Sequence, residues 1–279
     1  SSAVYRKLWL EEGSPLLVYG KSLTKKLNDN LGKDYVVELA MRYQNPSIKQ
    51  GLSILQKEHI SELIVLPLFP QYASATTGSI IEMVMKEIRL WQNFPAIRFI
   101  GPFYDHKGFI NGLVDKGKKY LDAESWDHIM FSFHGLPQRQ IIKASRGACN
   151  FDECCDSINE MNFSCYRAQC FETSRLLARA LDIQPDKYSV VFQSRLGKSP
   201  WIQPYAEDII RELPDKDIKR VLIFCPSFVS DCLETTVEVG VEFKELFIKA
   251  GGEKWQLVEG LNDSDVFMHT LQELIHIPG

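Results

Sequence analysis

The stretch that decides the fold is 128-HIMFSFHG-135, an apolar run that ends in a histidine and a glycine. Similar runs, rich in β-branched and aromatic residues, lie at 35–43, 62–69, 97–104, 188–195, 221–228 and 255–261. Between them are amphipathic stretches, such as 79–94 and 166–183, whose apolar residues return every three or four positions. Apolar strands that alternate with helices are typical of parallel sheets covered on both faces. The sequence therefore predicts a doubly wound α/β fold.

The expected strands divide into two groups, separated by a helical pattern at 106–123. We therefore expect two Rossmann-like halves, an N-terminal half at 1–105 and a C-terminal half at 106–279, with a ligand cleft between them. In such folds ligands bind at the carboxyl ends of the strands. The residues that follow each apolar run are thus the first candidates for a functional site.

Bulk properties exclude several classes of protein. The chain has 279 residues, of which 45% are hydrophobic and 24% charged, close to the averages of globular proteins. Its formal charge of −4 and the lack of a basic tract argue against a nucleic-acid partner. No apolar run is long enough to span a membrane, and the first residues lack the apolar centre of a signal peptide. We expect a cytoplasmic protein, with peripheral contact at the inner membrane left open.

Three strand ends carry side chains suited to chemistry. His134 stands between an apolar strand and a Gly-Pro turn, where an imidazole can act as a base or have only a structural role. The stretch 70-PQYASATTGS-79 offers hydroxyl groups, which can equally cap the helix that follows. The loop at 193–205 contains Trp201 and two cationic side chains, and no phosphate-binding glycine motif occurs in the chain.

A row of acidic residues follows the run at 221–228. It consists of Asp231, Glu234, Glu238 and Glu242. The spacing of four places the glutamates along one side of a helix, and a local π-helical widening would bring them nearly into line. A solvated acidic face is the ordinary explanation. The apolar neighbours of these residues instead favour a row that enters the cleft, where carboxylates can handle a divalent cation.

Five of the seven cysteines lie within 149–170, at Cys149, Cys154, Cys155, Cys165 and Cys170. In a cytosolic protein such a cluster favours metal or redox chemistry over a disulfide framework. Four thiolates satisfy either tetrahedral zinc or a [2Fe-2S] cluster.

Six motifs resemble the ferrochelatase family. They are GSPL (13–16), MRYQNPSI (41–48), LPLFPQYASATTGS (66–79), SFHGLP (132–137), QSRLGKSPW (193–201) and CPSFVSDCLETTVE (225–238). The resemblance implies two Rossmann-like domains around a porphyrin cleft, with protoporphyrin and ferrous iron as substrates and haem as product. It also implies that the family's first strand, with its Asn-Leu-Gly-Gly-Pro loop, precedes the residues of this sequence.

The resemblance assigns roles to individual residues. His134 matches the family's histidine and Glu234 its active-site glutamate. Glu238 and Glu242, with Asp231, match the acidic line that relays iron or protons. The matches in the porphyrin pocket are Arg42, Tyr43, Tyr72, Thr77, Gly78 and Trp201. Cys232 departs from the histidine of animal members and is a common bacterial variant.

The resemblance also interprets the cysteine-rich segment, which we expect to be an insertion at 147–170. Some bacterial ferrochelatases hold a [2Fe-2S] cluster in such an insertion. A cysteine aligned with Cys170 occurs in many plain members, so Cys149, Cys154, Cys155 and Cys165 are the expected ligands. Adjacent Cys154 and Cys155 are awkward joint ligands, and Cys170 can replace one of them. Structural zinc and free or disulfide-linked thiols remain alternatives.

Two other functions fit the same fold. A cobalt-inserting chelatase would share the cleft and differ in metal and tetrapyrrole preference. A non-catalytic porphyrin or metal carrier would need no base, so the combination of His134 with the glutamate row argues against it.

Overall fold

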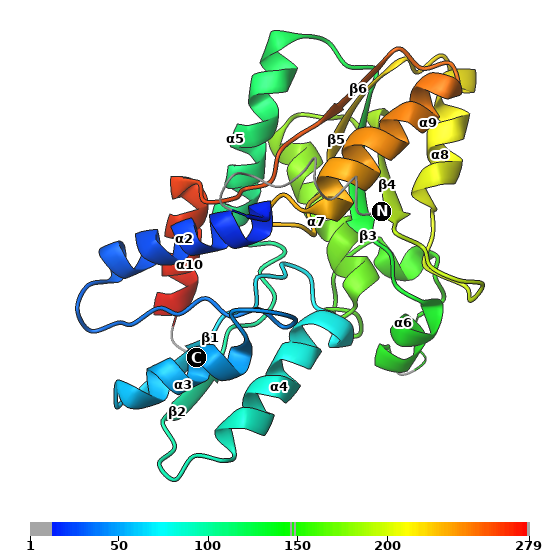
Figure 1. The fold of residues 1–279 in the computed structure, drawn as a ribbon. Coiled ribbons are helices and arrows are strands. Elements are labelled where there is room, and N and C mark those ends of the chain that lie inside the picture. The colour runs from blue at the N-terminus through cyan, green and yellow to red at the C-terminus, as the bar shows by residue number, and fades with distance from the viewer. Residues whose placement is uncertain (1–12, 146, 148, 278–279) are drawn as a thin grey trace.

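The computed structural model describes residues 13–145, 147 and 149–277. Its strands form two parallel sheets (Figure 1). The smaller sheet pairs β1 (Glu62–Val65) with β2 (Ala96–Phe99). The larger has the order β4-β3-β5-β6 and contains β3 (His128–His134), β4 (Tyr188–Gln193), β5 (Arg220–Phe224) and β6 (Lys254–Leu257). The expected α/β class with parallel sheets is confirmed.

Helices connect these strands. The α-helices are α2 (Pro15–Leu31), α3 (Ile48–Lys57), α4 (Ser79–Ile88), α5 (Lys107–Ala123), α6 (Gln138–Ala144), α7 (Tyr166–Ala180), α8 (Ala206–Glu212), α9 (Lys244–Lys249) and α10 (Asp265–His276). Two segments are π-helical, η1 (Ser74–Gly78) and η5 (Glu234–Phe243). Short 3₁₀ turns lie at η2 (Glu153–Cys155), η3 (Pro185–Lys187) and η4 (Leu213–Lys216).

The larger sheet is buried on both faces, as its continuous apolar strands require. On β3, Phe131 and Phe133 pack into a core formed with α5, α7 and α10. Met130, which precedes Phe131, lies in the opposite core, under α8 and η5. Alternate residues of a strand face opposite sides of its sheet. The buried polar side chains of β3 are hydrogen-bonded to β4, Ser132 to Gln193 at 2.7 Å and His128 to Ser189 at 2.8 Å.

One expected strand is wrong. Residues 35–43 join neither sheet, and their bridge between Met41 and Ser47 is isolated. The side chain of Asn28 instead pairs with the backbone of Val37, donating to its carbonyl at 3.0 Å and accepting from its N–H at 2.9 Å. The polar groups of Val37 are thus satisfied without a neighbouring strand.

The last helix returns to the N-terminal half. In Figure 1, α10 lies against α2, near α5, although it is the last element in the sequence. Arg98, in β2, anchors its end by donating to the carbonyls of Ile275 and Ile277 at 2.7 and 2.9 Å. The expected boundary near residue 105 divides the sheets, whereas α10 packs against both α2 of the N-terminal half and α5 of the C-terminal half. No helix within the described residues is long and apolar enough to cross a membrane.

Candidate functional site

His134 ends β3, the strand that lies between β4 and β5 in the larger sheet. Its Nδ1 lies 2.6 Å from the carbonyl oxygen of Gly135. A carbonyl only accepts, so Nδ1 carries the proton in a neutral ring and Nε2 has the free lone pair. The rings of Trp201 and Phe228 have centroids 6.4 and 6.3 Å away. The imidazole is therefore oriented as a proton acceptor between two aromatic side chains.

The predicted row of glutamates occupies η5, which is π-helical, the widening that would bring the glutamates nearly into line. In an α-helix a spacing of four overshoots a turn of about 3.6 residues, and the wider π turn reduces the overshoot. Glu234 and Glu238 are half-buried, whereas Glu242 is exposed. The row thus runs from solvent toward the end of the large sheet.

Gln193 and Ser194 connect His134 with this row. Gln193 is the partner of His134 in the β3–β4 register. Its buried amide donates to the Glu234 carbonyl at 3.0 Å and to Glu238 Oε2 at 3.2 Å. Ser194 donates to Glu238 from its backbone N–H at 2.8 Å and from its hydroxyl at 2.5 Å. These hydrogen bonds fix the Glu238 carboxylate at the end of β4, the strand that pairs with β3 at His134.

The sequence reasoning did not single out Gln193 or Ser194. No sequence signal marks them, because the burial of Gln193 and the positive φ of +63° at Ser194 are visible only in the structure.

Cys232 faces Glu234 near the start of η5. Burial and the neighbouring carboxylate of Glu234 raise the pKa of the Cys232 thiol to about 12. The thiol therefore stays protonated at neutral pH and acts as a weak donor to Glu234.

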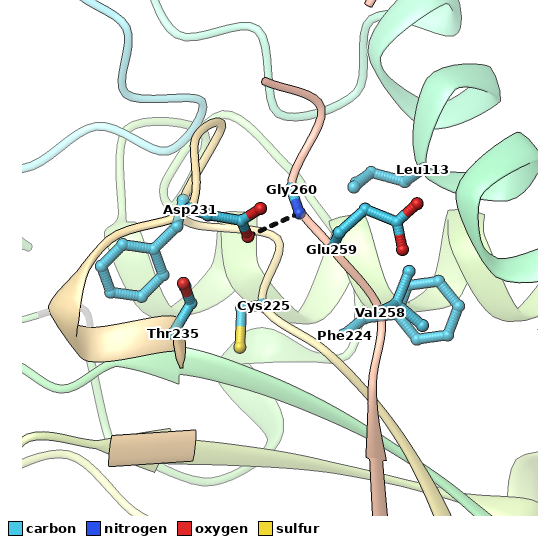
Figure 2. Close-up of a pocket in the computed structure, with 9 residues that line it drawn as sticks. Leu113, Phe224, Cys225, Asp231, Thr235, Val258, Glu259 and Gly260 are labelled. Carbon is cyan, nitrogen blue, oxygen red and sulfur yellow. Dashed lines mark hydrogen bonds between the residues drawn. The ribbon is translucent and has the colours of Figure 1, made fainter. Parts of the chain in front are cut away.

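Asp231 has a different environment from the glutamates. Its two carboxylate oxygens accept hydrogen bonds from the Gly260 N–H at 2.9 Å and from the Asn262 amide at 2.7 Å. Figure 2 shows Asp231 pointing to Gly260, beside a cavity of about 10 Å³ that also contacts Thr235. Such a cavity holds one water molecule and is too small for a tetrapyrrole. These contacts tie the loop after β5 to the loop after β6.

The hydroxyl-rich stretch forms η1, and none of its side chains caps the start of that turn. The Tyr72 hydroxyl lies 3.6 Å from where a Cβ on Gly78 would stand. Arg42 donates to the Ser79 hydroxyl at 2.6 Å and stacks on Tyr43, whose side chain is 72% exposed. Five of the residues expected in the porphyrin pocket, Arg42, Tyr43, Tyr72, Thr77 and Gly78, therefore lie in or next to the segments that meet at the start of α4, and Thr77 is buried among them.

The first turn of α7 joins this region to His134. The Tyr166 hydroxyl donates to the His134 carbonyl at 2.8 Å. The Gln169 side chain accepts from the Tyr72 N–H at 2.6 Å. One helical turn in the C-terminal half thus contacts both groups of predicted site residues.

Trp201, the remaining pocket candidate, is held by its loop. Its indole N–H donates to the Leu196 carbonyl at 3.0 Å, and Pro137 and Trp201 form an antiparallel bridge. A Cβ on Gly135 would stand 3.1 Å from the Trp201 ring. Glycine at this position therefore lets the indole lie beside His134.

The cysteine-rich segment contains η2 and ends in α7, so the expected insertion at 147–170 overlaps the first turn of that helix. The Sγ atoms of Cys149 and Cys154 lie 3.7 Å apart. Arg167, a buried cation, donates to Cys155 Sγ at 3.0 Å. Cys165 immediately precedes α7, and Cys170 lies inside it, fully buried in the core. In the part of the chain that the structure describes, no three or more histidine, cysteine or acidic side chains are arranged to hold a metal ion.

The thiols differ in their electrostatic surroundings. Burial raises the pKa of Cys149 to about 11 and that of Cys155 to about 12, although Arg167 opposes the second shift. Burial also raises the pKa of Cys154, but hydrogen bonds from its neighbours outweigh that effect and leave the pKa below the ordinary value. Of Cys149, Cys154 and Cys155, Cys154 is therefore the thiol that most readily becomes a thiolate.

Comparison with known proteins identifies the family. The Ferrochelatase family model matches residues 1–277. A ferrochelatase from Coxiella burnetii (strain Dugway 5J108-111) is 40% identical over 98% of this chain and 77% of its own length. One from Legionella pneumophila subsp. pneumophila (strain Philadelphia 1) is 41% identical over 99% of this chain and 82% of its own length.

Solved structures agree on the fold. SirB from Bacillus subtilis with Fe3+ has a TM-score of 0.60 at 13% identity, covering 95% of this chain and 92% of that one. CbiX, described as the terminal enzyme for biosynthesis of sirohaem in denitrifying bacteria, has a TM-score of 0.57 at 13% identity, with coverage of 94% and 93%. Both likenesses show a shared fold only. The relatives of high identity favour iron insertion over the cobalt-inserting and carrier alternatives, and the chain belongs to the ferrochelatase family, enzymes that insert iron into a porphyrin to form haem.

Proposed function

We propose that His134 accepts the protons that leave the pyrrole nitrogens when this enzyme inserts iron. The observation that carries the proposal is the hydrogen bond from Nδ1 to the Gly135 carbonyl, which leaves Nε2 as a lone-pair acceptor. Metallation removes two N–H protons from the macrocycle, so a fixed acceptor beside it lowers the barrier. The aromatic neighbours Trp201 and Phe228 keep water away from the proton acceptor.

The glutamate row would serve the cation and the released protons. Glu242 is exposed and can meet hydrated iron at the surface. Three hydrogen bonds to Glu238 fix the position of its carboxylate. Glu234, next along the row, has an exchangeable proton donor in Cys232. Asp231 is left out of this relay because both of its oxygens already bind Gly260 and Asn262.

The remaining predicted residues would hold the macrocycle. Trp201 and Tyr72 offer aromatic surface to the porphyrin ring. Arg42 offers a cation to carboxylate side chains of the porphyrin, with its guanidinium already oriented by Ser79. Binding of a bent ring would favour the geometry of metal insertion, because its nitrogen lone pairs then point toward the metal.

The test of the base is His134→Ala, with His269→Ala as a control at an exposed histidine. We expect His134→Ala to lower kcat for Fe(II) or Zn(II) insertion by about 100-fold or more, and to leave porphyrin binding within a few-fold. The control should keep normal turnover. Near-normal turnover in His134→Ala would remove this residue from the mechanism.

We also propose that the cysteine-rich segment binds a [2Fe-2S] cluster. Two thiolates on one tetrahedral metal, each at about 2.3 Å, stand about 3.8 Å apart, and Cys149 and Cys154 have nearly this spacing. Arg167 supplies a buried positive charge next to Cys155, which suits a site with several thiolates. Cys155 and Cys165 would complete the set after a change of side-chain rotamer, with Cys170 as the substitute ligand. When bound, the cluster supplies one-electron redox chemistry.

Anaerobic purification tests the cluster. We expect a red-brown protein with iron and acid-labile sulfide, whose visible absorption is bleached by dithionite. Cys165→Ser should lose the colour, and Cys225→Ser, a buried cysteine outside the segment, should keep it. A colourless protein without iron or sulfide would refute the cluster, and stoichiometric zinc would support the alternative metal.

A further inference from the structure

The first turn of α7 has three attachments in one short stretch. The helix begins directly after Cys165, whose carbonyl accepts from the Gln169 N–H at 3.0 Å. Tyr166 holds the His134 carbonyl, and Gln169 holds the Tyr72 N–H. The other end of the Gln169 amide donates to the Phe163 carbonyl at 2.6 Å, within the cysteine-rich segment. One side chain therefore links that segment to the loop that continues into η1.

Burial makes this link stiff. The Gln169 side chain is 0% exposed, and Tyr166 is almost as deeply buried. No water can take the place of a lost partner at such a position without opening the core. A displaced amide would leave buried polar groups unpaired, which is costly. The Phe163 carbonyl and the Tyr72 N–H are therefore expected to move together.

The position of Phe163 in turn depends on the cysteines. Its neighbour Asn162 donates to the carbonyls of Cys154 and Ser157, both at 2.7 Å. Asn162 also accepts from the Asn159 N–H at 2.7 Å, and its own carbonyl accepts from the Cys165 N–H at 2.7 Å. A continuous set of hydrogen bonds thus runs from the backbone of Cys154 and Cys165 through Asn162 and Phe163 to Gln169.

We propose that Tyr166 and Gln169 are positioning residues that couple the condition of the cysteine-rich segment to the porphyrin site. Through Gln169, a change in the segment displaces Tyr72 and alters porphyrin affinity. Through Tyr166, it displaces the end of β3 and alters the rate of proton removal by His134. The inference rests on the proposed roles of Tyr72 and His134 and on a metal or cluster held by the Cys165 thiol.

The variant Gln169→Glu separates the two ends of the amide. A carboxylate still accepts from the Tyr72 N–H, but it cannot donate to the Phe163 carbonyl when ionised. The connection to the cysteine-rich segment is then lost, while the contact with Tyr72 is kept. Gln184→Glu, at an exposed position after the same helix, is the control for the change of charge.

A double-mutant cycle with Cys165→Ser measures the coupling, with porphyrin affinity read from fluorescence. In the unmodified chain and in Gln184→Glu, we expect Cys165→Ser to weaken porphyrin binding by about 5-fold. In Gln169→Glu, the same substitution should have no further effect. Independent, multiplicative effects would overturn the proposal, as would a Cys165→Ser protein with unchanged affinity.

Amide hydrogen exchange gives a second readout that does not depend on turnover. As a single substitution, with Gln169 kept, Cys165→Ser should speed hydrogen exchange of the Tyr72 amide by about 10-fold, because the acceptor Gln169 loses its fixed position. An unchanged Tyr72 amide would refute the link. This outcome is independent of the His134 test, so failure of the coupling and failure of the proposed base are distinguishable.

Tyr166→Phe keeps the proposal testable if Gln169→Glu does not fold. The substitution removes one hydroxyl and keeps the ring. We expect kcat to fall about 5-fold with KM unchanged, together with a shifted pH profile of kcat, since the His134 carbonyl loses its donor. An unchanged kcat and pH profile would contradict the role of Tyr166.

Discussion

Gln193 illustrates how a single side chain can set the geometry of two functional groups. Its amide oxygen accepts from Ser132 at 2.7 Å, and its nitrogen donates to Glu238 and to the backbone of Glu234. These partners belong to two elements, β3 and η5. Because Gln193 is buried, water cannot replace its hydrogen-bond partners, and the amide keeps one orientation. The separation between His134 and the glutamate row is thus fixed by the core.

The glutamates should differ in importance along the row. We expect Glu234→Gln to lower kcat by about 100-fold, Glu238→Gln to have a smaller effect and Glu242→Gln only a few-fold effect. The physical reason is that Glu234 is half-buried at the inner end, whereas Glu242 is exposed to solvent, which screens its charge. Steady-state insertion of Fe(II) or Zn(II) measures these losses. A larger loss at Glu242 than at Glu234 would contradict the proposed direction.

His128 should limit stability in acid. Burial lowers the pKa of His128 to about 4, from an ordinary value of about 6.5. Below pH 6.5 the unfolded chain takes up a proton that the folded protein cannot bind until about pH 4, so stability falls as the pH is lowered through this window. The loss is up to about 3 kcal/mol. We expect His128→Gln to show a flatter decline in urea unfolding between pH 7 and pH 4.5.

The exposed His269→Gln is the matched control for this effect and should keep the pH dependence of the unmodified chain. An equally steep decline in His128→Gln would show that other groups cause the acid sensitivity.

At the level of elements, the strands follow closely from the sequence. Six of the apolar runs form strands, but most end earlier than the runs themselves. Pro67 and Pro226 cannot donate to a ladder, so the pairing of β1 and β5 stops before them. The run at 35–43 looks the same locally, and its exclusion depends on Asn28, a residue of α2. A pattern within one segment does not contain that information.

The π-helical form of η5 could be anticipated because its glutamates are spaced by four. The contacts that fix Glu238 could not, since Ser194 lies in a different loop and its positive φ is invisible in the sequence. Asp231 shows the same limit, because its partners Gly260 and Asn262 are remote in the chain. Residue type and spacing predicted the candidates, and only the fold distinguishes the carboxylate that holds loops together.

The close approach of α5 to β5 requires Gly117. A Cβ at this position would collide with the ring of Phe224, which is buried in the core. We expect Gly117→Ala to lower the free energy of unfolding by about 1–3 kcal/mol, because a packed core cannot absorb the extra methyl group. Gly101→Ala is the control, since a Cβ there meets no atom within 4 Å. Equal stability of the two variants, measured by urea unfolding, would contradict this packing.

At the scale of the whole molecule, two helices connect the halves. The first turn of α7 meets both groups of predicted site residues, and α10 packs against α2 and α5. The amphipathic pattern predicts that these segments are helices. The pattern does not predict which sheet these helices pack near, because that depends on contacts such as those of Arg98 with the carbonyls of Ile275 and Ile277.

Arg98 should therefore contribute to the stability of the whole protein. We expect Arg98→Lys to lower the free energy of unfolding by about 1–2 kcal/mol, because an ammonium group cannot donate in a fork to the carbonyls of Ile275 and Ile277. Glu62→Gln removes only the half-exposed ion pair with Arg98 and should have a smaller effect. Thermal unfolding of both variants measures the difference, and an equal loss would assign the effect to the ion pair.

The return of α10 to the N-terminal half has a consequence for how the protein is made. A ribosome delivers the N-terminal half first, yet α2 and α5 lack their apolar partner until Phe267 and Leu271 have been synthesised. The nascent chain must keep that apolar surface from aggregating throughout translation of the second sheet. A chain that lacks α10 would then expose the apolar surface of α2 and α5, and chaperones would be needed most by the segments that emerge first.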